Sequence, residues 1–107
     1  TGIPFKGREG HALFLRELAN VMAAAAGVRR FGAAALDLAY LAAGRYEGFW
    51  ERGLNSWDMA AGIIIVREAG GFVSDFEGRD NALATGEIVA ANSELHTPFR
   101  KLLSAAR

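Results

Sequence analysis

Apolar residues recur at helical spacing in the first quarter of the chain. The apolar positions that lie three or four residues apart are Leu15, Leu18, Met22 and Ala25. Arg16, Glu17 and Asn20 lie off this stripe, as expected for the solvent side of an amphipathic helix. The pattern predicts a helix over residues 12–26, which Gly27 would end.

Three further segments have the length and composition of helices. Residues 33–43 are almost wholly apolar apart from Asp37, which predicts a helix that is buried on most sides. Residues 57–69 contain a run of β-branched residues that also suits a strand, but their length and small residues favour a helix. The order Thr97-Pro98 is typical of a helix start, so the last helix is expected over residues 98–105.

Short apolar or aromatic runs between these helices predict strands. The expected strands are residues 28–31, 46–51, 72–74 and 88–91. The polar stretch 75–87 is rich in turn-forming residues and is expected to be a surface loop, and residues 93–96 are expected to form a turn. Because helices and strands alternate, the fold class is expected to be α/β, a layered sandwich with a mixed or parallel sheet flanked by helices, in one domain over residues 1–107.

Composition narrows the range of partners. Twelve basic residues balance twelve acidic ones without forming blocks, so neither direct nucleic acid binding nor a membrane surface is expected. No apolar run approaches the roughly 18 residues that a membrane span requires. The absence of cysteine fits a cytoplasmic location. The first residues lack a signal-peptide layout and read as the end of a strand, which predicts that a segment precedes Thr1 in a longer protein.

Candidate chemistry is concentrated between Glu51 and Gly62. The sequence has no Walker loop, no G-x-G-x-x-G and no H-E-x-x-H motif, and His11 and His96 are expected to have ordinary surface roles. In the stretch from Glu51, a strand ends at one acid, and a turn leads into a helix that begins near another, Asp58. Both acids are expected to face one cleft. The structural alternative is that Asp58 only complements the helix dipole beside a capping residue.

The run from Trp57 to Gly71 carries a family resemblance. It reads Trp-Asp, one variable residue, Ala-Ala-Gly, an apolar stretch, three variable residues and Gly-Gly, which is similar to the carboxy-terminal motif of the inositol monophosphatase family. The segments Arg29-Arg30-Phe31-Gly32, Ala35 to Tyr40 and Ile88 to Asn92 also resemble bacterial members of the extragenic-suppressor type. The resemblance covers essentially the whole chain and matches it to the carboxy-terminal half of the family's sugar-phosphatase fold.

The resemblance implies a phosphatase that uses two or three Mg²⁺ ions to polarise a phosphate ester and lower the pKa of an attacking water. Asp58 matches the family's catalytic, metal-binding aspartate and would also lie near the substrate's leaving hydroxyl. Glu51 matches the acid that binds a ring hydroxyl of inositol, with a solvated strand-end acid as the alternative. Gly32, Ala33 and Ala34 match the segment whose backbone lines the substrate, although they also suit a packed helix start. Many relatives have a hydroxyl residue where this chain has Ala33.

The resemblance also implies what this chain lacks. The family's other metal ligands lie upstream, in a glutamate site and an Asp-Pro-x-Asp-Gly-Thr motif, and this chain has no Asp-Pro pair. We therefore expect the chain to be the carboxy-terminal subdomain of a longer protein, inactive alone. Asp37 is expected to be structural and paired with Arg29 or Arg30.

The longer protein is expected to be a homodimer that hydrolyses inositol 1-phosphate. Alternative substrates that stay open are histidinol phosphate, fructose bisphosphate and phosphoadenosine nucleotides. A function of another class also stays open, namely a scaffolding role in ribosomal RNA transcription complexes.

Overall fold

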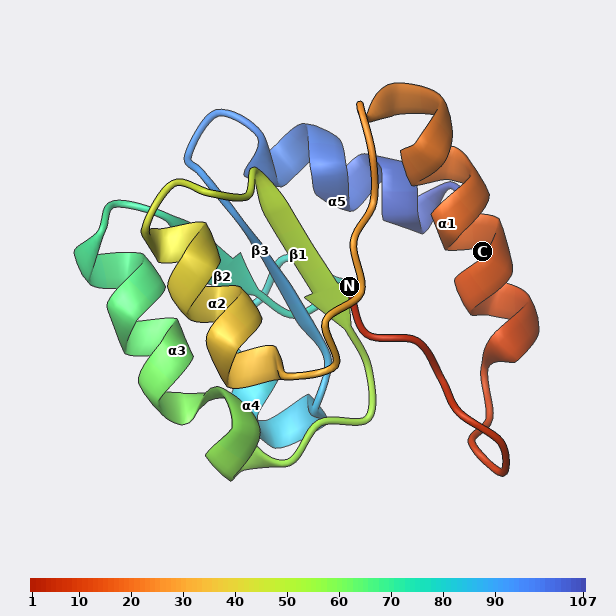
Figure 1. Ribbon diagram of the computed structural model, residues 1–107, viewed down its shortest axis with the longest axis horizontal. Coiled ribbons are helices and arrows are strands. Elements are labelled where there is room, and N and C mark those ends of the chain that lie inside the picture. Colours follow the sequence, from red (N-terminus) through yellow and green to blue (C-terminus); the bar gives the residue numbers. More distant parts are fainter.

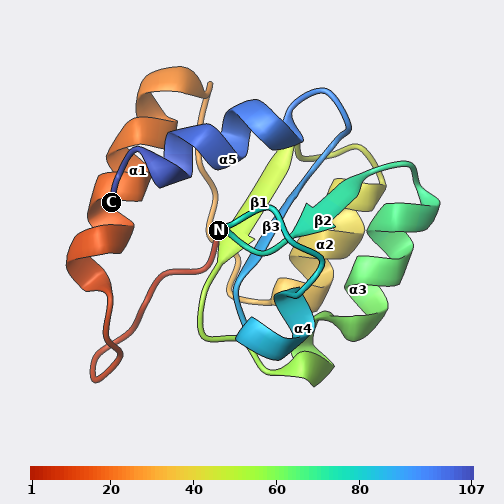
Figure 2. The ribbon, with the colours of Figure 1, turned by 180° about the vertical axis from the view of Figure 1, so that it is seen from behind.

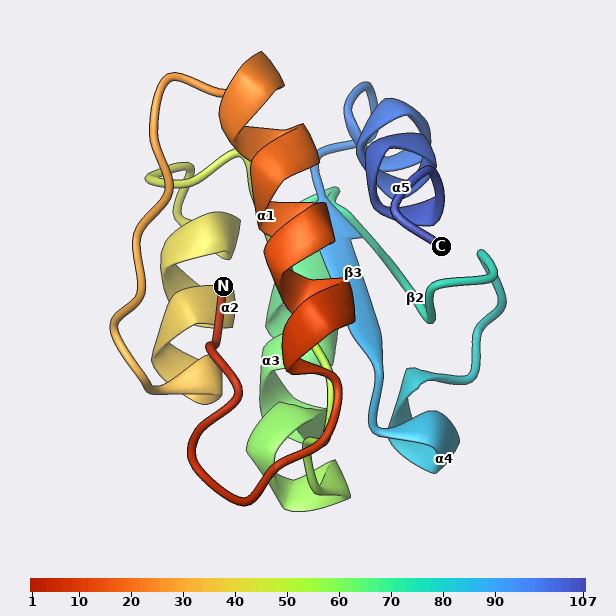
Figure 3. The same cartoon turned by 90° about the vertical axis from the view of Figure 1, so that its right-hand side faces the viewer.

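The computed structural model describes residues 1–107 and has three layers (Figure 1). A three-stranded sheet lies in the middle, with helices on both faces (Figure 3). The elements in chain order are α1 (His11–Ala24), α2 (Ala34–Ala42), β1 (Gly48–Glu51), α3 (Ser56–Glu68), β2 (Phe72–Ser74), α4 (Ala82–Thr85), β3 (Ile88–Ala91) and α5 (His96–Ser104). Helices α2 and α3 cover one face of the sheet, and α1 and α5 lie side by side over the other (Figure 2). The α/β sandwich predicted from the sequence is confirmed. None of the helices combines the length and the hydrophobicity that a membrane-spanning helix needs.

The sheet corrects one part of the prediction, because both of its strand pairs are antiparallel. Its order is β1-β3-β2, and β3 pairs antiparallel with each neighbour. Strands β1 and β2 therefore run parallel to each other, connected through α3, but β3 lies between them. This is a split βαβ arrangement. The alternation of helices and strands predicted the connection through α3, but it could not show that a later strand would enter the gap.

The alternation of side chains along the strands divides the core in two. Phe49 of β1 and Ile88 of β3 point toward α2 and α3, whereas Trp50 and Val89 point toward α1 and α5. All four residues of the central strand β3 are buried, as expected for a strand that is covered on both faces. The larger cluster consists of Leu38, Leu41, Phe49, Met59, Ile63, Val66, Val73, Ala82, Ile88 and Ala90. The smaller consists of Phe14, Val21, Trp50, Phe76, Val89 and Leu103.

Helices α2 and α3 pack closely because Gly62 lies where they meet. A Cβ atom at Gly62 would be only 2.6 Å from Cδ1 of Leu38, so a larger residue would push the helices apart. Leu38 and Met59, on either side of this contact, are fully buried. The close packing fixes α3 against α2.

One predicted strand is absent. Residues 28–31 are irregular, and no backbone amide bonds to residues 26–32; the carbonyl of Arg29 accepts only the amino group of Thr1, at 3.0 Å. A strand requires a ladder of hydrogen bonds to a neighbour, and this segment has no such ladder although it runs along the same side of the molecule as β1 (Figure 1).

Two connections also differ in detail from the prediction. The loop predicted over residues 75–87 contains the short helix α4. Helix α5 begins at His96 rather than Pro98, because the side-chain oxygen of Asn92 accepts the backbone N–H groups of Glu94 and Leu95 and turns the chain early.

Candidate active site

Glu51 and Asp58 line the same pocket, as the sequence pattern predicts. Glu51 is the last residue of β1, and Asp58 lies in the first turn of α3, which starts after a short turn. The pocket has a volume of about 170 Å³, and Arg8 also lines it. The geometry thus brings two carboxylates and one guanidinium to one end of the sheet. The chemical roles of the two acids stay predictions.

Asp58 combines a structural contact with a free oxygen. Its Oδ2 accepts the backbone N–H of Asn55 at 3.0 Å, and the two residues form the capping box of α3. No protein group bonds to Oδ1, and Asp58 forms no ion pair with an arginine or lysine. The capping residue is Asn55 and not the predicted Ser56, which is the first helical residue. Because Oδ2 serves the cap and Oδ1 has no partner, Asp58 can stabilise the start of α3 and also bind a ligand.

Glu51 is half-buried and its environment favours the protonated form. Burial raises the pKa of the Glu51 carboxyl, and the neighbouring carboxylates of Asp37 and Asp58 raise it further. The Thr1 ammonium group and the Arg8 guanidinium act in the opposite direction on this pKa. Gly2 lies so close to Glu51 that a Cβ atom there would overlap the Glu51 carboxylate. The amino-terminal segment is therefore part of the wall that holds Glu51.

Arg8 is a pocket residue that the sequence did not reveal. Its Nη1 donates a hydrogen bond to the carbonyl of Gly53 at 2.8 Å, and its guanidinium lies 4.9 Å from the centre of the Phe5 ring. These contacts tie the loop before α1 to the turn between β1 and α3. In the sequence, Arg8 is only one charged residue in a glycine-flanked loop, so no spacing connects it with residues more than forty positions away.

Gly32, Ala33 and Ala34 are not brought into this pocket. Gly32 has a positive φ of 79°, Ala33 precedes α2, and Ala34 is its first residue. None of the three lines the pocket of Glu51 and Asp58. Their predicted contact with a substrate stays a prediction, and within this chain they act as a helix start.

The structure corrects two expectations, the ion pair of Asp37 and the surface position of His96. Asp37 forms no ion pair with Arg29 or Arg30; its side chain is buried, and its Oδ2 has no hydrogen-bond partner. Burial raises the pKa of Asp37, and the Thr1 ammonium partly opposes this. His96 is buried rather than on the surface, 2.9 Å from Oγ of Ser74, and burial lowers its pKa. The other histidine, His11, is exposed as expected.

The residues of the pocket fit a magnesium ion only in part. A carboxylate oxygen such as Oδ1 of Asp58 is the ligand type that Mg²⁺ prefers, but the ion requires near-octahedral coordination. The chain contains no group of three or more His, Cys, Asp or Glu side chains that could hold a metal ion. Asp58 can therefore be one member of a ligand set whose other members lie outside these residues.

Comparison with known proteins agrees with the resemblance described above. Residues 5–106 match the model of the inositol monophosphatase family. The chain is 56% identical over 106 residues to an inositol-1-monophosphatase of Mesorhizobium japonicum, covering 99% of this chain and 39% of that protein. It is 50% identical over 106 residues to the Nus factor SuhB of Pseudomonas aeruginosa, covering 97% of this chain and 38% of that protein.

A solved structure shows the same fold. The extragenic suppressor protein suhB from Bartonella henselae superposes with a TM-score of 0.91 at 53% identity, over 95% of this chain and 39% of that one. The chain thus spans about two fifths of the length of the relatives that it matches.

Proposed function

This chain belongs to the inositol monophosphatase family, and from that membership we propose that it is the carboxy-terminal part of a phosphatase that hydrolyses phosphate monoesters. The observation that carries the proposal is the shared pocket of Glu51 and Asp58, formed by residues of the matching segment. Because the chain spans 39% of its relative, the activity is proposed for the longer protein that contains it, called the parent protein below.

We propose that Asp58 binds Mg²⁺ through Oδ1 while Oδ2 keeps its contact with the backbone of Asn55. When bound, such an ion supplies Lewis acidity toward the phosphate ester and lowers the pKa of a water. The capping contact has a separate use, because it fixes the rotamer of Asp58 and so removes the entropic cost of orienting the ligand. The carboxylate also lies at the positive end of the α3 dipole, which stabilises its ionised form.

We propose inositol 1-phosphate as the substrate, with Glu51 accepting a hydrogen bond from a ring hydroxyl. A half-buried carboxylate has lost part of its hydration, so a hydroxyl donor compensates it, whereas an apolar leaving group would leave it without a partner. Glu51 lies on a strand that is buried at Phe49 and Trp50, so its backbone position is well defined. Other polyol phosphates also carry hydroxyl groups that could donate a hydrogen bond to Glu51.

The isolated chain is expected to release no phosphate from inositol 1-phosphate in the presence of Mg²⁺, because one carboxylate cannot hold the catalytic ions. The parent protein, assayed under the same conditions, is expected to be active. Phosphate is measured colorimetrically against a sample without protein, and circular dichroism verifies that the isolated chain is folded. Phosphate release by the isolated chain above that background would contradict the proposal that the other metal ligands lie outside these 107 residues.

Glu51→Gln in the parent protein is expected to lower kcat/KM for inositol 1-phosphate by about 10- to 100-fold, the range for a hydrogen bond to a charged group. The loss for p-nitrophenyl phosphate, which has no ring hydroxyl, is expected to be much smaller. Glu68→Gln is the matched control, because Glu68 is exposed at the far end of α3 and has no ion pair. An equal loss for both esters would show that Glu51 does not select polyols, and a preference of the parent protein for a nucleotide would exclude inositol phosphate as the main substrate.

A second candidate function is a role in transcription complexes. It is favoured by relatives named Nus factor SuhB, which are 50% and 52% identical to this chain. Because basic and acidic residues are balanced here, such a role would depend on contacts with proteins rather than directly with RNA. The test is growth of cells that require the parent gene and carry only the Asp58→Asn variant of the parent protein, which lacks hydrolysis. Normal growth of these cells would favour the role in transcription complexes over the enzymatic function.

A further inference from the structure

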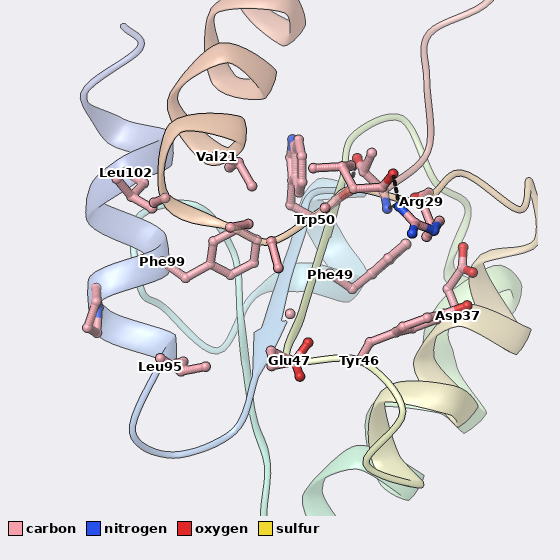
Figure 4. A pocket seen from close by; sticks show the side chains of 18 residues that line it. Val21, Arg29, Asp37, Tyr46, Glu47, Phe49, Trp50, Leu95, Phe99 and Leu102 are labelled. Atoms are coloured by element: carbon pink, nitrogen blue, oxygen red, sulfur yellow. Dashed lines mark hydrogen bonds between the residues drawn. The ribbon is translucent and has the colours of Figure 1, made fainter.

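Two further cavities lie outside the pocket of Glu51 and Asp58, and their walls differ in polarity. The larger, beside β1, has a volume of about 570 Å³ and a mainly apolar wall that includes Val21, Phe99 and Leu102 (Figure 4). The other, called the β2 pocket below, has a volume of about 410 Å³ and lies along β2, between the end of α3 and the start of α5 (Figure 2). Strand β2 is at the opposite edge of the sheet from β1, and the β2 pocket shares no residue with the other two.

Hydrogen-bond donors dominate the wall of the β2 pocket. The guanidinium groups of Arg67 and Arg100 lie there together with the hydroxyl of Thr97. The backbone N–H of Thr97 has no backbone partner, because it belongs to the first turn of α5. Thr97 and Arg100 are three residues apart and therefore share one face of this helix. The wall contains one carboxylate, that of Asp80.

Arg100 is the positive charge of this wall that no protein group neutralises. It forms no ion pair, whereas Nη2 of Arg67 donates to Oδ1 of Asp80 at 2.6 Å. Burial lowers the pKa of the His96 imidazole, and the Arg100 guanidinium lowers it further, so His96 adds no charge near neutral pH. The wall thus carries one positive charge in excess. Because Arg100 is half-buried, an anion at its guanidinium is screened less by water than at a fully exposed arginine.

Gly78 lets the guanidinium of Arg100 lie against the turn that follows β2. A Cβ atom at Gly78 would be 3.0 Å from both Cζ and Nε of Arg100, and the φ of Gly78 is 83°. Both the space and the backbone conformation therefore favour glycine here. The turn is also held by Oδ1 of Asp75, which accepts the backbone N–H groups of Glu77 and Arg79. A guanidinium that packs against a fixed turn loses less conformational entropy when it binds a ligand.

We propose that the β2 pocket binds a phosphorylated small molecule, whose phosphate oxygens accept hydrogen bonds from the guanidinium of Arg100 and from the N–H and hydroxyl of Thr97. The positive end of the α5 dipole adds to the attraction for the phosphate. A phosphate group fills only part of the pocket, and the ring of Phe72, which is 52% exposed, lies in the same wall. The rest of the ligand is therefore apolar or aromatic and packs against Phe72. The single carboxylate of the wall is held by Arg67, so binding without metal-dependent hydrolysis is expected at this site.

The test is titration of the parent protein with phenylphosphonate, a phosphate analogue that carries an aromatic ring and has no ester bond to hydrolyse. EDTA removes divalent cations, so the pocket of Glu51 and Asp58 holds no metal ion that would bind the probe. NMR follows the backbone amide signals of Gly78 and Thr97 in the β2 pocket and that of Gly53 in the other. The signals of Gly78 and Thr97 are expected to shift and to saturate with one common Kd, whereas the signal of Gly53 stays in place.

Arg100→Gln is expected to raise the Kd for phenylphosphonate by about tenfold or more, the range for a hydrogen bond to a charged group. Arg79→Gln is the matched control, because Arg79 lies in the neighbouring turn but is exposed, forms no ion pair and is not part of the wall. Its Kd is expected to change by less than about threefold at physiological salt, since exposed charges are screened. Arg100→Lys keeps the charge without the planar fork, and its Kd is expected to lie between those of the unmodified protein and Arg100→Gln.

Methylphosphonate tests the contribution of the ring. It is expected to bind the unmodified protein about three- to tenfold more weakly than phenylphosphonate, and Phe72→Ala is expected to remove this difference. The difference between the two probes within one variant does not depend on any loss of stability that the substitution causes. An undiminished preference for phenylphosphonate in Phe72→Ala would contradict the proposed packing of the ligand.

Three outcomes would overturn the phosphate site itself. Without a saturable shift of Gly78 and Thr97 at millimolar phenylphosphonate, the β2 pocket binds no phosphate group. An equal rise of the Kd in Arg79→Gln and Arg100→Gln would reduce the interaction to diffuse attraction by the arginines of this surface. A shift of the Gly53 signal in place of the other two would locate the probe in the pocket of Glu51 and Asp58.

Discussion

Asp58→Asn in the parent protein is expected to lower phosphate ester hydrolysis by about a hundredfold or more, because even residues that only orient a metal ligand contribute about 10- to 100-fold. Asparagine keeps a side-chain oxygen that can accept the backbone N–H of Asn55, so the start of α3 is preserved while the anionic ligand is lost. The measurement is kcat/KM for inositol 1-phosphate as a function of Mg²⁺ concentration. Excess Mg²⁺ is expected to restore activity only in part.

Asn55→Ala is the matched control for this prediction. It weakens the same capping box from the other residue and costs about 1 kcal/mol of stability, but it leaves the Asp58 carboxylate in place. Activity per folded molecule is expected to stay within a few-fold of the unmodified protein. If Asn55→Ala reduced hydrolysis as severely as Asp58→Asn, the effect would arise from the helix start, and Asp58 would not be a metal ligand.

Arg52→Ala is expected to destabilise the protein by about 3–5 kcal/mol, the cost of leaving a buried charge without its partner. Nη1 of Arg52 donates to Oε1 and Oε2 of Glu17 at 2.6 and 2.5 Å, and the Glu17 side chain is completely buried. The Arg52 guanidinium also lies 3.6 Å from the centre of the Phe76 ring, so alanine removes packing as well as charge. The measurement is urea-induced unfolding of the 107-residue chain, followed by circular dichroism.

The double variant Glu17→Met with Arg52→Met separates charge from packing. Replacing both members of a buried ion pair by apolar residues of similar length is often neutral, so this variant is expected to be clearly more stable than Arg52→Ala. If the double variant were as unstable as the single one, lost packing rather than the unpaired carboxylate would explain the cost. If Arg52→Ala had almost no effect, water would reach Glu17 and the pair would contribute little.

Local sequence patterns predicted the type and the bounds of most helices and strands. Strands β2 and β3 have the predicted bounds, and four predicted helices are present within about two residues at each end, a difference typical of helix ends. The convergence of Glu51 and Asp58 was also predictable, since a short turn from a strand end to a helix start leaves little freedom. These features depend on residues close together in the chain.

Features that depend on distant residues could not be predicted. The buried face of α1 was predicted wrongly, because Leu15 and Met22 of the predicted apolar stripe are 62% and 61% exposed. Glu17, which was expected on the solvent side, is instead completely buried against Arg52, 35 positions away.

Three further features depend on which segments pair in the sheet. They are the direction of the strands, the irregular backbone of residues 28–31 and the lack of a hydrogen-bond partner for Oδ2 of Asp37. The burial of His96 has the same origin, because His96 begins α5 and its partner Ser74 lies in β2, 22 positions earlier.

The central position of β3 affects how the chain can acquire its structure. Strands β1 and β2 form no backbone hydrogen bonds with each other. Within the sheet each pairs only with β3, residues 88–91, which come late in the sequence. During synthesis from the amino terminus, helices α1, α2 and α3 can form early, whereas the sheet cannot assemble until this last strand has left the ribosome. Closure of the sheet therefore depends on long-range pairing, which is entropically costly, and the half-made chain leaves two strand edges open to aggregation in the interval.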